Sequence, residues 1–146
     1  MKNVHQLIPF GTLIAGAAVA SIVVTLEGQA PAPVRDFRNA TVAQVRDAQG
    51  QVVLQGHFEM PVEEDGGLER LAILAPAGAD TDAKGEAELE FASATPIEQE
   101  VEFSVQNLAP AARFVFVIDG IEVATATTDR NGRAEVELDI RMPSRD

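Results

Sequence analysis

Residues 113–140, RFVFVIDGIEVATATTDRNGRAEVELDI, decide the fold of this chain. Asp119-Gly120 stands between two alternating apolar runs, and this dipeptide tolerates the positive φ angles of a type I′ hairpin turn. A two-residue loop at this point places Phe116 opposite Val123 and directs Val117 to the other face. The two runs therefore predict a hairpin with one apolar face, formed by Phe114, Phe116, Ile118, Ile121 and Val123.

A second turn, Asp129-Arg130-Asn131-Gly132, joins this hairpin to the run that ends at Ile140. A three-residue loop would direct the acidic side chains of that run to the apolar face. An even loop, with Asn131-Gly132 as another type I′ turn, directs the apolar side chains there instead. Because a one-residue slip flips every side chain, burial favours the even loop. The sequence thus predicts a three-stranded β-meander with Val136, Leu138 and Ile140 on its apolar face and Glu135, Glu137 and Asp139 on its acidic face.

Three segments share the pattern Asp-x-x-Gly and precede alternating sequence; they begin at Asp47, Asp82 and Asp129. Asp at the first position and Gly at the last favour a type I turn, in which the Asp side chain accepts hydrogen bonds from the turn amides. Such residues also occur in calcium loops, but an EF-hand-type loop needs more oxygen ligands and a glutamate at its twelfth position. These segments lack both, so we interpret them as turns and keep calcium binding as the alternative.

Period-2 alternation between these turns predicts the strands of the domain. We expect strands near residues 41–46, 51–60, 69–74, 85–92, 97–106, 113–118, 121–128 and 133–140, with the longest loops at residues 61–67 and 75–84. Regular spacing of short strands with turn signals is typical of β-sandwiches. The expected fold is all-β: an antiparallel β-sandwich of about eight strands, immunoglobulin-like or related, preceded by one N-terminal apolar helix.

The alternation also assigns side chains to faces. Apolar side chains expected in the core are Leu54, Phe58, Ala87, Leu89, Phe91, Val101, Phe103 and Val105. Carboxylates opposite one another across strands repel and keep strand edges from pairing. We interpret the acidic side as a solvated face, with weak divalent-cation binding or a basic partner as alternatives. Besides the acidic residues of the last strand, it carries Glu86, Glu88, Glu90, Glu98, Glu100 and Glu102.

The segment from Leu7 to Leu26 contains no charged residue. Its length of about 20 residues matches that of a helix crossing a bilayer. Lys2 before it and Glu27 after it carry the signs expected for an N-terminus left in the cytoplasm. We predict a signal anchor, with a cleaved signal peptide and a buried core helix as alternatives.

The domain boundaries follow from this segment. Residues 1–26 are the signal anchor or signal peptide, and Ala18-Val19-Ala20 has the form of a cleavage site. Residues 27–39 form a Pro/Ala-rich linker, because Ala-Pro repeats favour an extended, semi-stiff chain. The β-sandwich domain is expected to occupy residues 40–146.

Composition excludes several activities. The chain has no cysteine, and therefore no disulfide, thiolate metal site or cysteine nucleophile. It carries a formal net charge of −12, and because Lys2 and Glu27 cancel, this charge belongs to the domain. A domain so acidic repels nucleic acid and anionic lipid surfaces. The absence of Trp and Tyr argues against a lectin-like role, because carbohydrate sites rely on exposed aromatic side chains.

No catalytic or cofactor-binding residue is predicted, and metal ligands stay unassigned. His57 is the one histidine of the domain, and the alternation around it directs it outward. Nucleophilic catalysis needs a nucleophile with a base in reach, and none of Ser93, Ser104 and Ser144 lies in a G-x-S-x-G elbow. A lone outward histidine is therefore interpreted as a polar strand residue.

The sequence predicts a non-enzymatic, export-directed protein without a cofactor. It would be tethered to the cell membrane as a single-pass protein through Leu7 to Leu26, with its domain outside the cytoplasm, or else be secreted or periplasmic. There it would act as a structural or interaction module with a protein partner. The alternative is a divalent-cation or small-ligand-binding domain that uses the acidic strand faces or the D-x-x-G turns.

Overall fold

The computed structural model describes residues 35–92 and 98–142, which form β-strands joined by turns, with no helix. The prediction of an all-β, antiparallel fold is confirmed. The strand from Val62 to Glu64 is additional, since it lies in a stretch predicted to be a loop. The strands are β1 (Val42–Arg46), β2 (Val52–His57), β3 (Val62–Glu64), β4 (Gly67–Pro76), β5 (Lys84–Phe91), β6 (Glu98–Gln106), β7 (Arg113–Ile118), β8 (Ile121–Thr127) and β9 (Ala134–Arg141).

The predicted membrane segment, Leu7 to Leu26, lies outside the described residues, as does most of the expected linker. Within residues 35–92 and 98–142 there is no helix of the length and apolarity needed to cross a membrane.

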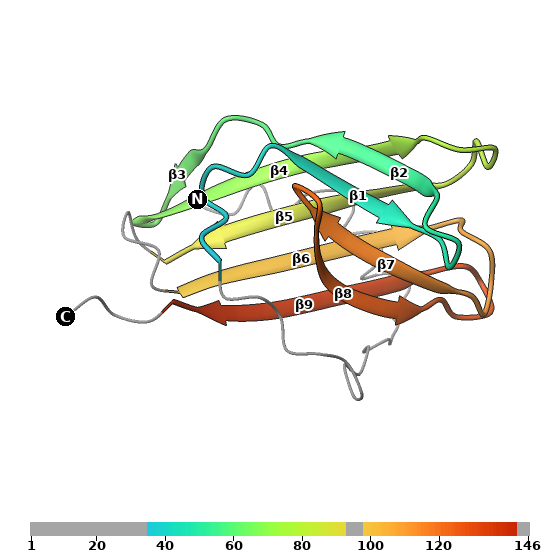
Figure 1. Cartoon of the computed structure of the whole chain (residues 1–146). Coiled ribbons are helices and arrows are strands. Elements are labelled where there is room, and N and C mark those ends of the chain that lie inside the picture. Colours follow the sequence, from blue (N-terminus) through green and yellow to red (C-terminus); the bar gives the residue numbers. More distant parts are fainter. Residues whose placement is uncertain (1–34, 93–97, 143–146) are drawn as a thin grey trace.

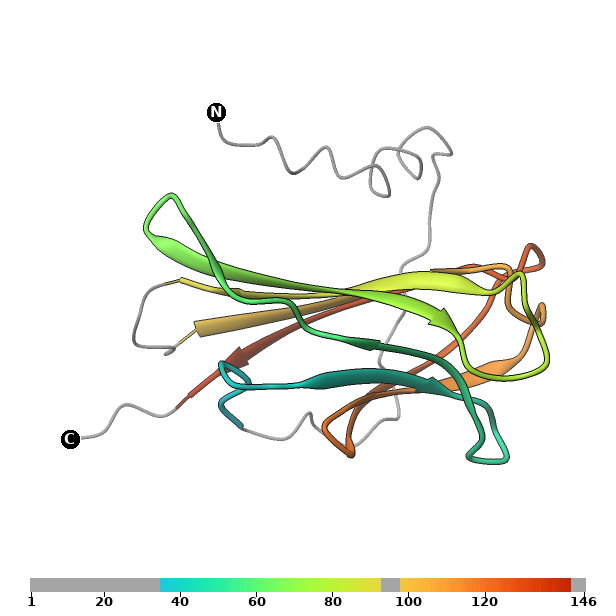
Figure 2. The ribbon, with the colours of Figure 1, turned by 90° about the horizontal axis from the view of Figure 1, so that it is seen from above.

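All nine strands belong to one sheet that curls until its two ends approach each other. The strand order is β8-β7-β1-β2-β4-β5-β6-β9, and β3 pairs with β4. Figures 1 and 2 show β1, β2, β7 and β8 as one layer facing β4, β5, β6 and β9. Strands β2 and β4 share only a short ladder, in which Leu54 faces Pro76 and Gln55 faces Ala75. The sheet passes from one layer to the other at this ladder, and the result is a nearly closed, barrel-like sheet.

The predicted pairing of the last two strands is wrong. Strand β9 crosses to the other layer and pairs with β6 along its whole length, from Ala134 to Arg141. In the turn before it, only Gly132 has a positive φ, of 76°, so Asn131-Gly132 is not a type I′ turn. Alternation determines which face of a strand is buried but not which strand lies beside it. The face itself is predicted correctly, because Val136, Leu138 and Ile140 are buried.

The β7–β8 hairpin has the predicted turn and a different register. Asp119 and Gly120 have φ angles of 48° and 81°, and Ile118 faces Ile121 across the turn. A bulge beside Phe116 then shifts the pairing by one residue, so that Phe116 faces Ala124 and not Val123. Because a bulge sets two residues against one, Val123 and Ala124 are both buried.

The core lies between the two layers. The rings of Phe103 on β6 and Phe116 on β7 meet in a tilted arrangement, with centroids 5.0 Å apart and an interplanar angle of 60°, within the distance range of favourable aromatic pairs. Val117, predicted to point to the face opposite Phe116, is also fully buried but is not part of this core cluster. The core residues predicted from alternation are all buried, namely Leu54, Phe58, Ala87, Leu89, Phe91, Val101, Phe103 and Val105.

Candidate functional site

Carboxylates lie in rows across the outer side of β4, β5, β6 and β9. The rows arise because the three ladders are in continuous register: Glu88 faces Glu102, which faces Glu137. The outward direction predicted for these side chains is confirmed, since the residues between them are buried. We call the set the acidic face; it consists of Glu69, Glu86, Glu88, Glu90, Glu100, Glu102, Glu135, Glu137 and Asp139.

The middle of the acidic face is not fully solvated, in contrast to the expectation from sequence. Glu88 and Glu102 are only half-exposed. Burial first, and then the neighbouring charges, led by that of Glu69, together raise the pKa of Glu88 to about 8. Burial first, and then neighbouring charges, led by that of Glu137, together raise the pKa of Glu102 to about 7. Burial alone raises the pKa of Glu86 to about 7. The face therefore holds protons at neutral pH, and the formal charge of −12 overstates its charge.

Glu100 shows how two carboxyl groups accommodate each other in the next row. Its pKa is raised to about 7, first by burial, then by the charges of Glu137 and Glu90, and also by a side-chain hydrogen bond with Glu90. A hydrogen bond between two carboxyl groups requires one of them to be protonated, because an ionised carboxylate only accepts. The raised pKa of Glu100 therefore lets its protonated form donate to Glu90 near neutral pH.

Two groups of three carboxylates lie close enough to contact one cation. One oxygen from each member lies within 4.8 Å of the others in the groups Glu69, Glu88, Glu90 and Glu100, Glu102, Glu137. Calcium takes six to eight oxygen ligands. Each triad could thus supply part of a calcium shell, the remainder coming from water.

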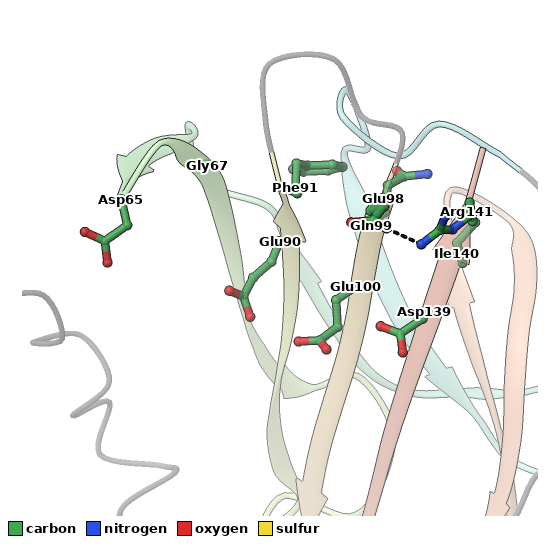
Figure 3. A pocket seen from close by; sticks show the side chains of 11 residues that line it. Asp65, Gly67, Glu90, Phe91, Glu98, Gln99, Glu100, Asp139, Ile140 and Arg141 are labelled. Carbon is green, nitrogen blue, oxygen red and sulfur yellow. Dashed lines mark hydrogen bonds and ion pairs between the residues drawn. The ribbon is translucent and has the colours of Figure 1, made fainter. Parts of the chain in front are cut away.

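A cleft of ≈ 560 Å³ lies at one end of the acidic face. Figure 3 shows Glu90, Glu100 and Asp139 side by side along one side of it, with Asp65 of the β3–β4 hairpin across from them. Arg141 forms an ion pair with Glu98 at its margin. Five of the eleven lining residues are acidic, so the cleft continues the charge of the face.

Apolar side chains border the acidic face on β4. Leu71 faces Glu88 and Ile73 faces Glu86, and Ile73 is 55% exposed. The sequence did not indicate this border, because β4 carries apolar residues on both of its sides and its alternation is therefore weak. Charge does not distinguish the two sides either, because the adjacent residues Glu69 and Arg70 place one charged side chain on each.

Two of the three D-x-x-G segments are the predicted turns. The Asp47 carboxylate accepts hydrogen bonds from the amides of Gln49 and Gln51, both at 2.9 Å. Asp129 accepts them in the same way from Asn131 at 2.7 Å and Arg133 at 2.9 Å. Both carboxylates accept hydrogen bonds from amides of their own turns, and this occupancy argues against a role as calcium ligands.

The third segment, from Asp82 to Gly85, is not such a turn. Lys84 begins β5, and Gly85 lies within that strand. A Cβ on Gly85 would lie 2.6 Å from the carbonyl oxygen of Ser104, so glycine is needed there for the close approach of β5 and β6.

The candidate catalytic residue types are not brought together. His57 is exposed at the end of β2, as predicted, and Ser104 lies on β6 in the opposite layer. Ser93 and Ser144 lie outside the described residues.

Comparison with known proteins adds no relative: no family model matches the chain, and neither a curated protein nor a solved structure matches it.

Proposed function

We propose that this protein is a non-enzymatic interaction module whose acidic face receives a basic partner outside the cytoplasm. The observation that carries the proposal is the register of β5, β6 and β9, which gathers carboxylates in rows on one surface. As a more specific description of the fold, we propose that the domain is a β-sandwich related to the immunoglobulin class. The consecutive order β1-β2-β4-β5-β6 differs from the ABED and CFG sheets of that class itself.

Charge and shape favour a cationic partner with some apolar side chains. Complementary potentials steer association and select partners. The exposed Ile73 and the neighbouring Leu71 give the same surface an apolar margin, where a partner could bury area as well as neutralise charge. Half-buried carboxyl groups such as Glu88 would gain most from a basic partner, because a nearby positive charge favours their ionised form.

The test is binding of a synthetic peptide of alternating Lys and Leu to the full chain, followed by fluorescence anisotropy. Replacing Glu88, Glu102 and Glu137 together by Gln is expected to weaken binding about tenfold or more, which is about 1.4 kcal/mol. The matched control replaces Glu59, Glu63 and Glu122, all exposed and outside the acidic face, by Gln. Equal losses in both triple variants would show that net charge, and not this face, attracts the peptide.

We further propose that the segment from Leu7 to Leu26 tethers the domain to the membrane. Its support is its length and lack of charge. Recovery of the full chain in the carbonate-resistant membrane fraction is the expected result. A mature N-terminus at Ser21 or Pro31 would contradict the tether.

The second candidate is a divalent-cation-binding domain, favoured by the two carboxylate triads. A specific site would stabilise the fold as RT ln(1 + [L]/Kd), so the shift would saturate and would be selective for one ion. Melting in sodium chloride and in calcium chloride at equal ionic strength separates the two candidates. Coincident melting curves would leave only screening of the acidic face, and a calcium-selective shift removed by a chelator would establish the second candidate.

A further inference from the structure

The chain between Arg35 and Ala40, here called the N-terminal strap, is packed onto the domain before β1 begins. Phe37 and Ala40 are buried in the core, at 2% and 3% exposure. The strap forms no ladder with any strand, so its backbone groups need other partners. Side chains of β6 and β4 supply partners along the strap, and a side chain of the β7–β8 turn supplies them where the strap meets β1.

Gln99 on β6 holds the first part of the strap. Its amide nitrogen donates to the carbonyl oxygen of Arg35 and its amide oxygen accepts from the N–H of Phe37, both at 2.7 Å. Gln99 is itself only 3% exposed. The strap thus satisfies both ends of a buried amide, and removing either partner would leave a buried polar group unpaired.

Arg70 on β4 holds the second part. Its guanidinium donates to the carbonyl oxygens of Arg38, at 2.9 Å, and Ala40, at 2.6 Å. The same group also donates to the carbonyl oxygen of Glu59, at 3.0 Å, and lies 5.7 Å from the centroid of the Phe58 ring. Arg70 therefore joins the strap, β4 and the segment after β2 at the place where β2 and β4 diverge.

Asp119, in the β7–β8 turn, holds the junction between the strap and β1. Its carboxylate accepts hydrogen bonds from the N–H of Thr41 at 3.0 Å, the hydroxyl of Thr41 at 2.8 Å and the N–H of Val42 at 2.9 Å. Charge-assisted hydrogen bonds of this kind are roughly twice as strong as neutral ones.

We propose that the strap is a mechanical latch, which passes a pull arriving from the N-terminus to β6 and β4 before it reaches β1. This inference rests on the proposed tether, since only an anchored chain is pulled from that side. Force applied at Arg35 meets Gln99 first, Arg70 second and Asp119 last. The load is thereby shared between both layers of the sheet, and β1 is protected from being peeled from its neighbours.

Force spectroscopy of the full chain, held in a nanodisc, tests the latch. The chain has no cysteine, so Gln29→Cys and Ser144→Cys give two unique attachment points. We expect the strap to stay docked until the whole domain unfolds. In a variant combining Arg70→Met and Gln99→Leu, the strap should release first at lower force. The gain in length should be less than roughly 20 Å, which is the full extended length of its six residues.

Two further variants make the result specific. Arg46→Met is the matched control and should leave the force trace unchanged, because among the described residues the Arg46 guanidinium donates to the side chain of Gln44 and not to the strap. Arg70→Lys keeps the charge but not the planar fork, and should give the early release in milder form. It also serves as the test if the double variant does not fold.

Early release of the strap in the parent protein would overturn the proposal. So would variants whose folded state is less stable in urea but whose strap still unfolds together with the domain. Membrane fractionation tests the tether separately: a soluble chain would refute the tether, and the measured strap release would still decide whether the latch holds.

Discussion

Glu88 on β5 lies directly opposite Glu102 on β6, and both side chains are half-buried on the outer side of the sheet. Burial first, and then the charges of neighbouring carboxylates, raise the pKa of Glu88 to about 8 and that of Glu102 to about 7. Since these values lie above the ordinary glutamate value of 4.5, the folded protein binds more protons than the unfolded chain between pH 4.5 and 8. Stability must therefore fall as the pH rises through this range.

We expect the melting temperature to be highest near pH 5 and to decrease steadily up to about pH 8, at constant ionic strength. The double variant Glu88→Gln with Glu102→Gln should flatten this decline, because its amides do not ionise. Circular dichroism across a pH series measures it, with Glu122→Gln on β8 as the exposed control. A melting temperature that rises from pH 5 to pH 8 would refute the assignment.

Asp119 should have the opposite effect on the pH dependence of stability, which it should lower in acid. Partial burial raises its pKa, but hydrogen bonds from Val42 and Thr41 outweigh this and hold the pKa below the ordinary value. Its contribution is present above the ordinary aspartate pKa and is lost as the pH falls through the lowered one. Asp119→Asn keeps a residue that tolerates positive φ, so we expect a loss of about 1 kcal/mol at pH 7 that vanishes in acid. A loss of equal size at pH 2 and pH 7, measured by urea unfolding, would contradict this account.

Phe116→Ala should destabilise the domain by about 3–5 kcal/mol, because it empties a fully buried position that contacts the opposite layer. Val115→Ala, on the half-buried outer side of the same strand, should cost clearly less. Urea unfolding compares the two variants. Similar losses would mean that the layers are not joined through this ring contact.

Gly56→Ala tests the place where β2 meets β4. A Cβ at Gly56 would lie 2.1 Å from the carbonyl oxygen of Ile73, so the strands must separate to admit it. We expect a loss of at least about 2 kcal/mol, within the range of overpacked cores. Gly66→Ala is the control: its φ is 82° but nothing lies within 4 Å of the added atom, so only backbone strain of about 1 kcal/mol applies. Thermal melting that ranks Gly66→Ala as the more damaging change would overturn this view of the junction.

The local sequence pattern was sufficient to predict where the strands lie and which face of each is buried. It was insufficient to predict the order of the strands in the sheet. Period-2 alternation predicted β6 and β9 and the burial of Phe103 and Val136, because each depends only on neighbouring residues. The pairing of β9 with β6 depends on how a curled sheet closes, which no single turn encodes. The bulge beside Phe116 is likewise a property of two strands together.

The sequence predicted that the side chains of the acidic face point outward, but not that some of them are half-buried. Alternation predicted that Glu88 and Glu102 point outward. Their partial burial depends on the register of neighbouring strands, which places one carboxylate beside another. The strap was missed for another reason. Its anchors, Arg70 and Gln99, are polar residues at inward positions of strands, and that irregularity was the one signal in the sequence.

The carboxylates of β9 also govern how copies of this protein behave toward each other. Among the described residues, β9 has a hydrogen-bonded neighbour only on its β6 side, and Glu135, Glu137 and Asp139 are exposed along it. Two copies aligned edge to edge would set these like charges against one another, and such contacts are destabilising. Concentrated solutions should therefore stay monodisperse at neutral pH, and acidification, which removes the repulsion, should be the condition under which the chains aggregate.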